Sequence, residues 1–331
     1  MRVWFPTVRT NTGTDIYTMR LATGLEKMGI KTAITWLPHH AEIFPFLWQK
    51  TRPPFRPTII HTNSWNGFAF AQKNVPLVVT AHLPVLEHDV ASYKNLLQRC
   101  YHQTLIRHYE TLSFQKAVKV IAVSQYALQA YRRHYPLPQA EVIYNGVDLD
   151  TFSPLPHVAH RPFRLLFAGS WSKRKGVDLL YDIMASLGED YELWIASPTP
   201  LKQTSLPKHS QYAGHARHKD MARLYQSCDL LIFPSRLEGL SLVVAEAMAC
   251  GLPVVASAVS SLPELIEDHQ SGLLCPVDDV LAFIKAIKRL AEDAALLKKM
   301  GEAARSRIVE HFSERVMLKH YQKLYATLSA E

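Results

Sequence analysis

The stretch SRLEGLSLVVAEAMACGLPVV, Ser235–Val255, places two carboxylates in a segment that is otherwise apolar. Glu238 and Glu246 are eight residues apart, and the apolar run Asp229–Ser235 (DLLIFPS) precedes them. That run predicts a buried strand that ends in a loop, and Leu242–Ala249 has the composition of a buried helix. The stretch therefore predicts a strand, a loop with one acid and a helix with the other, which is the repeating unit of an α/β fold.

The start of the predicted helix is suited to bind an anion. Gly239 allows close approach of a ligand, and Leu240, Ser241 and Leu242 open the helix with N–H groups that have no intrahelical partner. These groups and the helix dipole favour a phosphate or diphosphate, whereas carboxylates accept hydrogen bonds from sugar hydroxyls. Glu238, the amides at the helix start and Glu246 would therefore bind a sugar hydroxyl, a phosphate and a second hydroxyl in turn. A nucleotide diphosphate sugar presents its groups in this order. This layout requires the helix to begin between Leu240 and Val243.

Strands and helices alternate through the first half of the chain. Apolar runs predict strands at Val3–Val8, Thr32–Leu37, Thr58–His61, Leu77–Thr80, Val118–Val123 and Glu141–Tyr144. Helical patterns lie between them at Asp15–Met28, which Gly29 should end, and at Val90–Gln115. The alternation predicts a parallel sheet with helices on both faces.

The pattern stops at Val147–Phe163, which contains three prolines and is interpreted as a linker, and then restarts. Strands are predicted at Phe163–Ser170, Tyr191–Ser197, Leu230–Phe233 and Pro253–Ala256, and helices at Lys175–Gly188, Met221–Gln226, Leu242–Ala249, Val277–Ala291, Ala294–His311 and Glu314–Leu328. We expect two doubly wound, Rossmann-like α/β domains, 1–150 and 151–331, with the last helix crossing back to the first. Ligands of such folds bind beyond the carboxyl ends of the strands, which predicts a cleft between the domains.

The net charge of +8 is concentrated in the first half. Residues 1–150 contain 16 Lys and Arg against 9 Asp and Glu, whereas residues 151–331 contain 21 against 20. A basic half suggests an anionic partner, such as a membrane surface, an acidic acceptor or nucleic acid. A basic surface without such a partner is the alternative.

The sequence lacks the motifs of several other classes of protein. Dinucleotide-binding and Walker-type glycine loops, zinc-binding patterns and RNA-reading motifs are absent, so we expect no bound metal and no nucleic-acid partner. The cysteines form no C-x-x-C pair and are interpreted as buried free thiols in a reducing cytoplasm: Cys100, Cys228, Cys250 and Cys275. No apolar run approaches ~20 residues and no secretory signal opens the chain, so we expect a cytoplasmic protein.

The spacing of Glu238 and Glu246 is the E-x7-E motif of retaining GT-B glycosyltransferases, and the surrounding segment resembles glycosyltransferase family 4. Further segments are similar to that family in the family's order: HTNSWNGFAFAQKNVPLVVTAH, VIAVSQYALQAYRRHY, VIYNGVDLDTFSP and LLFAGSWSKRKGVDLL. The resemblance covers nearly the whole chain. It implies a GT-B fold, in which Glu238 contacts the hydroxyls of the donor sugar, Glu246 contacts the ribose, and amides near Ser241 and Leu242 hold the distal phosphate.

The turn SWSKRKG supplies cations after a predicted strand. Arg174 and Lys175 could neutralise the charge on a leaving diphosphate in place of a metal ion. The family often has Gly-Arg where this chain has Gly169–Ser170, so we expect Arg174 and Lys175 to take this role. The Arg-Lys-Gly sequence at residues 174–176 is similar to that of lipopolysaccharide core glucosyltransferases. A solvated basic loop is the alternative.

Two residues of the first half match positions that contact ligands in the family. Gly13 resembles the second glycine of the family's Gly-Gly loop, with Thr12 in place of the first, and should lie near phosphate or acceptor. His82 follows a buried strand, and the resemblance implies contact with the donor sugar through the ring or the backbone carbonyl. A satisfied core histidine is the alternative for His82.

The resemblance implies hexosyl transfer from a nucleotide diphosphate sugar, with UDP-glucose favoured, to an acceptor hydroxyl, with retention and without a metal. The basic first half favours an anionic glycan or lipid-linked acceptor of the cell envelope, and peripheral contact with the inner face of the cytoplasmic membrane. Two alternatives stay open. One is a nucleotide-sugar epimerase of related fold, and the other is a non-catalytic subunit that binds nucleotide sugar and activates a partner.

Overall fold

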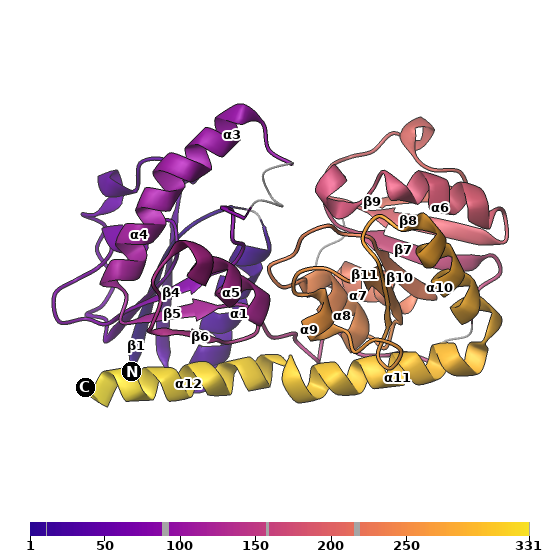
Figure 1. The fold of residues 1–331 in the computed structure, drawn as a ribbon. Coiled ribbons are helices and arrows are strands. Elements are labelled where there is room, and N and C mark those ends of the chain that lie inside the picture. The colour runs from indigo at the N-terminus through magenta and orange to yellow at the C-terminus, as the bar shows by residue number, and fades with distance from the viewer. Residues whose placement is uncertain (11, 88–92, 157–158, 215–218, 331) are drawn as a thin grey trace. The chain divides into compact units, whose positions relative to one another are not determined.

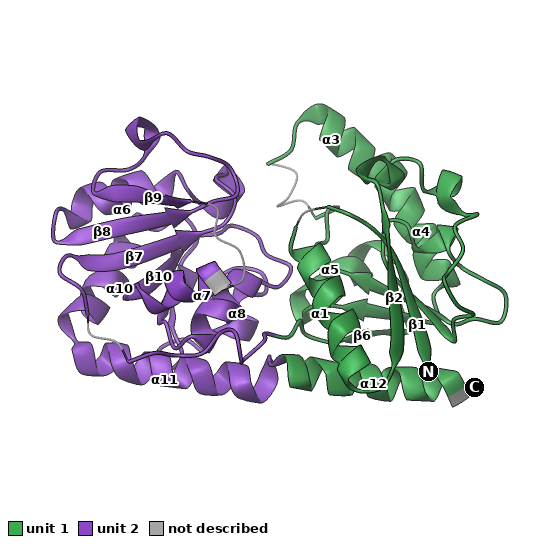
Figure 2. Ribbon diagram, turned by 180° about the vertical axis from the view of Figure 1, so that it is seen from behind, with its two compact units in different colours: residues 1–146, 314–331 green, residues 147–313 purple. Residues whose placement is uncertain are grey.

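The computed structural model describes residues 1–10, 12–87, 93–156, 159–214 and 219–330 and divides into two compact units (Figure 1, Figure 2). Unit 1 comprises residues 1–146 and 314–331, and unit 2 comprises residues 147–313. The chain leaves unit 1 at Gly146, four residues before the boundary expected at residue 150, and re-enters it at Glu314. The final helix therefore belongs to the first unit although it follows the second in sequence.

Unit 1 is built on a parallel sheet with the strand order β2-β1-β3-β4-β5-β6. Its strands are β1 (Arg2–Val8), β2 (Lys31–Leu37), β3 (Ile59–Asn63), β4 (Leu77–Ala81), β5 (Lys119–Ala122) and β6 (Ala140–Val142). Its longer helices are α1 (Gly13–Lys27), α3 (Leu96–Tyr101), α4 (Arg107–Lys116), α5 (Gln125–His134) and α12 (Glu314–Ala330). The short turns are η1 (His39–Glu42), η2 (Pro45–Trp48), η3 (Gly67–Ala69) and the π-helical η4 (His102–Ile106). The predicted α/β alternation is confirmed in this unit.

The helix α12 packs with α1 on one face of the first sheet. Its apolar side chains join those of α1 and of the central strands in a single buried core. A buried polar chain crosses the same interface, where Nδ1 of His61 lies 2.6 Å from the hydroxyl of Tyr325 and Nε2 lies 2.7 Å from Thr80 Oγ1. Polar groups removed from water must find such partners. These hydrogen bonds therefore help to define the position of α12 against β3.

Unit 2 repeats the architecture with the strand order β12-β11-β10-β7-β8-β9, again parallel. Its strands are β7 (Phe163–Ala168), β8 (Tyr191–Ala196), β9 (Ser210–Gly214), β10 (Leu230–Phe233), β11 (Val254–Ser257) and β12 (Leu273–Cys275). Its helices are α6 (Leu179–Leu187), α7 (Lys219–Gln226), α8 (Leu242–Ala249), α9 (Leu262–Leu265), α10 (Val280–Glu292) and α11 (Ala294–His311), with short turns η5 (Lys173–Lys175) and η6 (Gln203–Ser205). Both units are thus Rossmann-like, which confirms the predicted fold class.

Three differences from the sequence prediction have simple causes. The segment interpreted as a linker begins as packed structure, because Val147 and Phe152 are buried in unit 2. The strands β9 and β12 were not predicted, since one is a half-buried edge and the other has three residues. Helix is described from Leu96 rather than Val90, and the predicted residues 90–92 lie outside the described part of the chain.

Gly301 marks a close approach of α11 to the turn after α8. A Cβ at this position would lie 2.2 Å from the carbonyl oxygen of Gly251, a backbone atom that cannot swing aside. Replacing glycine by alanine inside a helix normally stabilises the helix by about 1 kcal/mol. At position 301 the added methyl group would overpack the interface, so the same replacement should destabilise the protein. We expect Gly301→Ala to lower the free energy of unfolding by about 2 kcal/mol in a denaturant titration. An increase in that free energy would contradict this packing.

Candidate functional site

The stretch that carries both acids has the predicted local structure. β10 ends at Phe233, a loop holds Glu238, and α8 begins at Leu242 with Ser241 as its N-cap. The hydroxyl of Ser241 accepts a hydrogen bond from the Val244 amide at 3.4 Å. The helix therefore begins between Leu240 and Val243 as expected, and its first amides lie in sequence between the two carboxylates.

Glu238 is 7% exposed, and its carboxylate is held by two hydrogen bonds and a further ion pair. Its Oε1 atom lies 2.6 Å from Nζ of Lys175, 2.5 Å from Oγ of Ser235 and 3.6 Å from Nη1 of Arg174. Its backbone amide donates to Oγ of Ser260 at 2.8 Å. The side chain is thus fixed at the carboxyl end of β10, rather than free on a surface loop.

Lys175 reaches this carboxylate from the turn after β7. Gly176 follows it with φ of 70°, and a Cβ there would lie 2.0 Å from the carbonyl oxygen of Pro234. Only glycine permits this approach of the two loops. The Lys175 ammonium is buried, lies 4.8 Å from the centroid of the Phe233 ring, and pairs with Glu238. Burial lowers the pKa of Lys175, and the Glu238 carboxylate opposes that decrease.

Arg174 is tied to the same loop through its guanidinium, which donates to the carbonyl oxygen of Leu237 at 2.8 Å. Arg236 also contacts this turn, because it donates to the carbonyl oxygen of Lys173, and it donates to Asp178 at 2.7 Å and to Asp278 at 2.6 Å. These two aspartates raise the pKa of Arg236. The structure therefore places Arg174 and Lys175 together beside Glu238, in a cluster with two cations and one carboxylate.

Glu246 lies one turn into α8 and is 8% exposed. The hydroxyl of Tyr225 on α7 donates to its Oε2 atom at 3.4 Å. Both acids of the opening stretch are therefore buried polar groups of unit 2, which agrees with a specialised role better than with ordinary surface carboxylates.

Gly13 and His82 lie in unit 1. Gly13 is the first residue of α1, and Thr12 is the N-cap of that helix. His82 follows β4, with Nε2 3.1 Å from Oδ1 of Asn63 and its ring 4.9 Å from the ring of Tyr17. Burial lowers the pKa of His82 to about 4, so the imidazole is neutral at pH 7.

Sequence reasoning missed the residues that fix this site. Ser235, Ser260 and Arg236 hold the acid and the basic turn in place, and Asn63 holds His82. Ser235 and Arg236 both lay inside the decisive stretch, but only Ser235, a polar residue at the end of an apolar strand, gave a local signal. The other three act across loops, which no local pattern records.

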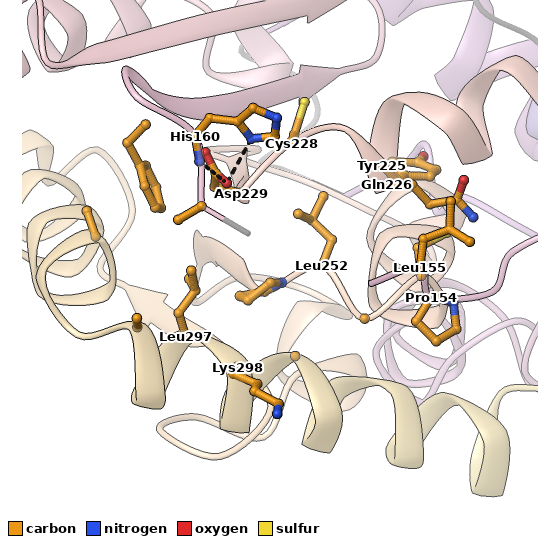
Figure 3. A pocket seen from close by; sticks show the side chains of 18 of the residues that line it. Pro154, Leu155, His160, Tyr225, Gln226, Cys228, Asp229, Leu252, Leu297 and Lys298 are labelled. Carbon is orange, nitrogen blue, oxygen red and sulfur yellow. Dashed lines mark hydrogen bonds and ion pairs between the residues drawn. The ribbon is translucent and has the colours of Figure 1, made fainter. Parts of the chain in front are cut away.

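A cavity of about 1580 Å³ in unit 2 is lined by Tyr225, the partner of Glu246, but not by Arg174, Lys175 or Glu238 (Figure 3). Its lining includes His160, Asp229 and Leu252, which precede β7, β10 and β11, with Leu297 and Lys298 on α11. The amino ends of parallel strands lie at the opposite edge of a sheet from their carboxyl ends. The cavity is therefore separate from the Glu238 cluster, and Asp229 in it accepts hydrogen bonds from the backbone amides of His160, before β7, and Arg164, within β7.

In the described part of the chain, no group of three or more His, Cys, Asp or Glu side chains is arranged to hold a metal ion. Within the same ranges, no helix combines the length and the apolar character needed to cross a membrane.

Two family models match the chain, one in each half. Residues 156–307 match the model described as glycosyl transferases group 1, and residues 33–151 match the model described as glycosyltransferase family 4. A glycogen synthase of Mycobacterium tuberculosis is 26% identical over 286 residues. That match covers 78% of this chain and 66% of the synthase.

Solved structures share the fold across nearly the whole chain. Sucrose-phosphate synthase of Thermosynechococcus elongatus is similar with a TM-score of 0.83 at 22% identity, covering 99% of this chain and 100% of that one. Alr3699/HepE of Anabaena, solved in complex with UDP-glucose, gives a TM-score of 0.77 at 19% identity, covering 99% and 100%. At these identities the similarity concerns the fold alone.

Proposed function

We propose that this chain, which belongs to the GT-B glycosyltransferases of group 1 and family 4, transfers a hexosyl group from a nucleotide diphosphate sugar to an acceptor hydroxyl with retention. The observation that carries the proposal is the cluster in unit 2. A buried lysine and an arginine lie beside a buried glutamate, and the first amides of α8 follow that glutamate in the chain. Cations and amides suit a diphosphate, and the carboxylates suit sugar hydroxyls.

The proposed roles follow from this chemistry. Glu238 binds hydroxyls of the donor sugar, Glu246 binds the ribose, and the amides at the start of α8, from Gly239 to Leu242, bind the distal phosphate. Lys175 has three N–H donors, and Glu238 engages one of them, so others remain for a phosphate oxygen. Unit 2 would then bind the donor, and unit 1, with Gly13 and His82, would bind the acceptor and contact the sugar.

The proposed reaction needs no side chain as general base. The bond between the sugar C1 and the diphosphate oxygen breaks, the acceptor oxygen attacks C1 on the same face, and its proton passes to the leaving phosphate oxygen. Negative charge grows on the diphosphate, where Lys175, Arg174 and the α8 amides stabilise it. The products are the glycoside and a nucleoside diphosphate. We favour UDP-glucose or a similar donor, because HepE, which shares the fold, was solved with UDP-glucose.

The test of this function is product analysis by NMR with each nucleotide sugar, with and without candidate acceptors. We expect release of nucleoside diphosphate to depend on acceptor, the new linkage to keep the anomeric configuration of the donor, and excess chelator to leave the rate within about twofold. Nucleoside diphosphate formed without acceptor would favour the epimerase or a hydrolytic side reaction. Activity that chelator abolishes and magnesium restores would contradict the metal-independent mechanism.

The charge of the two units supports an anionic or membrane-linked acceptor. Unit 1 contains 19 Lys and Arg against 9 Asp and Glu, a balance of +10, whereas unit 2 contains 18 against 20, a balance of −2. Large apolar side chains are also exposed on unit 1, among them Phe44, Phe46, Leu47, Leu96 and Leu97. Apolar side chains together with an excess of positive charge suit the interface of an anionic bilayer. We therefore propose peripheral contact at the inner face of the cytoplasmic membrane, through unit 1.

Leu97 provides a matched test of that contact. It is 83% exposed at the second position of α3, and Leu281 is 68% exposed at the second position of α10 in unit 2. Aspartate is favourable in the first turn of a helix, so neither Leu97→Asp nor Leu281→Asp should unfold its helix. The affinity for vesicles of phosphatidylserine and phosphatidylcholine can be measured by co-sedimentation. Leu97→Asp should lower this affinity about tenfold, and Leu281→Asp should leave it unchanged.

The binding itself should also weaken as salt rises, since screening shortens the reach of the unit 1 charge. An equal loss of vesicle affinity in Leu97→Asp and Leu281→Asp would contradict the assignment of the membrane contact to unit 1. Binding that salt leaves unchanged would indicate apolar anchoring without the electrostatic contribution.

A further inference from the structure

Three polar side chains meet at the carboxyl edge of the sheet in unit 1. Thr7 lies on β1, Asn63 ends β3, and His82 directly follows β4. β1, β3 and β4 are neighbours in the strand order, so these residues form a row across the edge. We call Thr7, Asn63 and His82 the edge row.

Hydrogen bonds in the edge row run in one direction. Nδ2 of Asn63 donates to Oγ1 of Thr7 at 2.8 Å, and Oδ1 of Asn63 lies 3.1 Å from Nε2 of His82. A carboxamide oxygen can only accept, so Nε2 must carry the proton of the imidazole. A neutral imidazole has one N–H, so Nδ1 of His82 then carries the lone pair.

The surroundings keep the imidazole neutral. Burial lowers the pKa of His82 to about 4 and that of His61 to about 3, and the Tyr17 ring that packs on His82 has a raised pKa. Among the residues that the structure describes, no carboxylate pairs with His82, and its Nδ1 atom has no hydrogen-bond partner. His82 is half-buried, so a ligand can reach the ring.

We propose that Asn63 is a positioning residue, which holds His82 as its Nε2–H tautomer and so presents the Nδ1 lone pair to a hydroxyl of the bound substrate. The inference rests on the proposed function for the identity of that hydroxyl, which belongs to the donor sugar or the acceptor. An aspartate at position 63 would fail in this role. Its negative charge would favour the imidazolium, in which both nitrogens donate and neither accepts.

The tautomer can be measured without substrate, in the full chain labelled with ¹⁵N-histidine. The wild type should show the Nε2–H form of His82 between about pH 6 and 8, a range well above its lowered pKa. Asn63→Ala should show both tautomers, and Asn63→Asp should raise the pKa of His82.

Asn66→Ala is the matched control. Asn66 is a buried asparagine of the same unit whose side-chain amide has no partner in the described residues, and its loss should leave the tautomer unchanged. An Nδ1–H tautomer in the wild type, or an Asn63→Ala spectrum equal to wild type, would overturn the proposal.

Kinetics then separates positioning from a structural effect. Asn63→Ala should lower kcat/KM about tenfold, the cost of a hydrogen bond that is no longer oriented. In a His82→Ala background the same substitution should have no further effect, because Asn63 acts only through His82. An equal tenfold loss in both backgrounds would show that Asn63 acts elsewhere. Absence of transfer in the wild type would contradict the proposed function and leave the tautomer result standing.

Discussion

Replacing Glu238 with glutamine should reduce kcat about 10²- to 10³-fold, the range found when an oriented catalytic hydrogen-bonding group is lost. The substitution keeps the size of the side chain but removes the charge that pairs with Lys175 at 2.6 Å. Donor hydroxyls would lose a strong acceptor, and the buried ammonium would lose its partner. Steady-state transfer kinetics over several donor concentrations measures the effect.

The pH dependence of Glu238→Gln gives a second signature. The carboxylate raises the pKa of Lys175 against the effect of burial, so its removal should allow that pKa to decrease further. Residual activity should then decline at a lower pH than in the wild type, as Lys175 loses its proton. Glu192→Gln is the control, because Glu192 is a half-exposed carboxylate of the same unit that pairs with Arg164 at 3.4 Å. Unchanged transfer by folded Glu238→Gln protein would remove Glu238 from the mechanism.

Replacing Lys175 with alanine should lower kcat about 10³-fold, since the charge that develops on the leaving diphosphate would lose the buried cation of the Glu238 cluster. The loss should appear in kcat and also as weaker binding of the donor, because the ammonium contacts the diphosphate in the ground state and the interaction strengthens as the diphosphate gains charge. The thermal midpoint of folding should fall as well, since Glu238 would remain buried without its lysine. Single-turnover kinetics and thermal unfolding measure the two effects.

Lys173 provides the control within the same turn. It is an exposed cation two residues before Lys175. Lys173→Ala should keep kcat within about threefold of wild type, because a solvated charge contributes little. Equal losses in Lys173→Ala and Lys175→Ala would mean that the turn acts through its overall charge and not through a defined contact.

The parts of the account that could be predicted from sequence are those that local patterns encode. The strand Leu230–Phe233 and the helix Leu242–Ala249 have the predicted bounds, because a buried apolar run and a serine N-cap are local signals. Gly29 and Gly188 end their helices with positive φ, as glycine after a helix usually does. The setting of Glu238 between a strand end and a helix start followed from these elements.

The parts that could not be predicted depend on contacts between distant segments. Ser260 reaches Glu238 from 22 residues away, and Asn63 reaches His82 from 19. Such pairs are specified by the register of the parallel strands, which sequence periodicity does not determine. The burial of Phe152 was missed because it depends on another distant contact, with Tyr225 on α7.

Ligand-induced thermal stabilisation measures whether the Glu238 cluster binds a nucleotide diphosphate sugar. At about 100 times its Kd, a ligand that binds only the folded state should add about 2.7 kcal/mol to the free energy of unfolding. We expect at least one nucleotide diphosphate sugar to raise Tm of the wild type and of Lys173→Ala, and to raise it much less in Lys175→Ala and Glu246→Gln. A full panel that leaves Tm unchanged, or an equal rise in all four proteins, would contradict binding at this cluster.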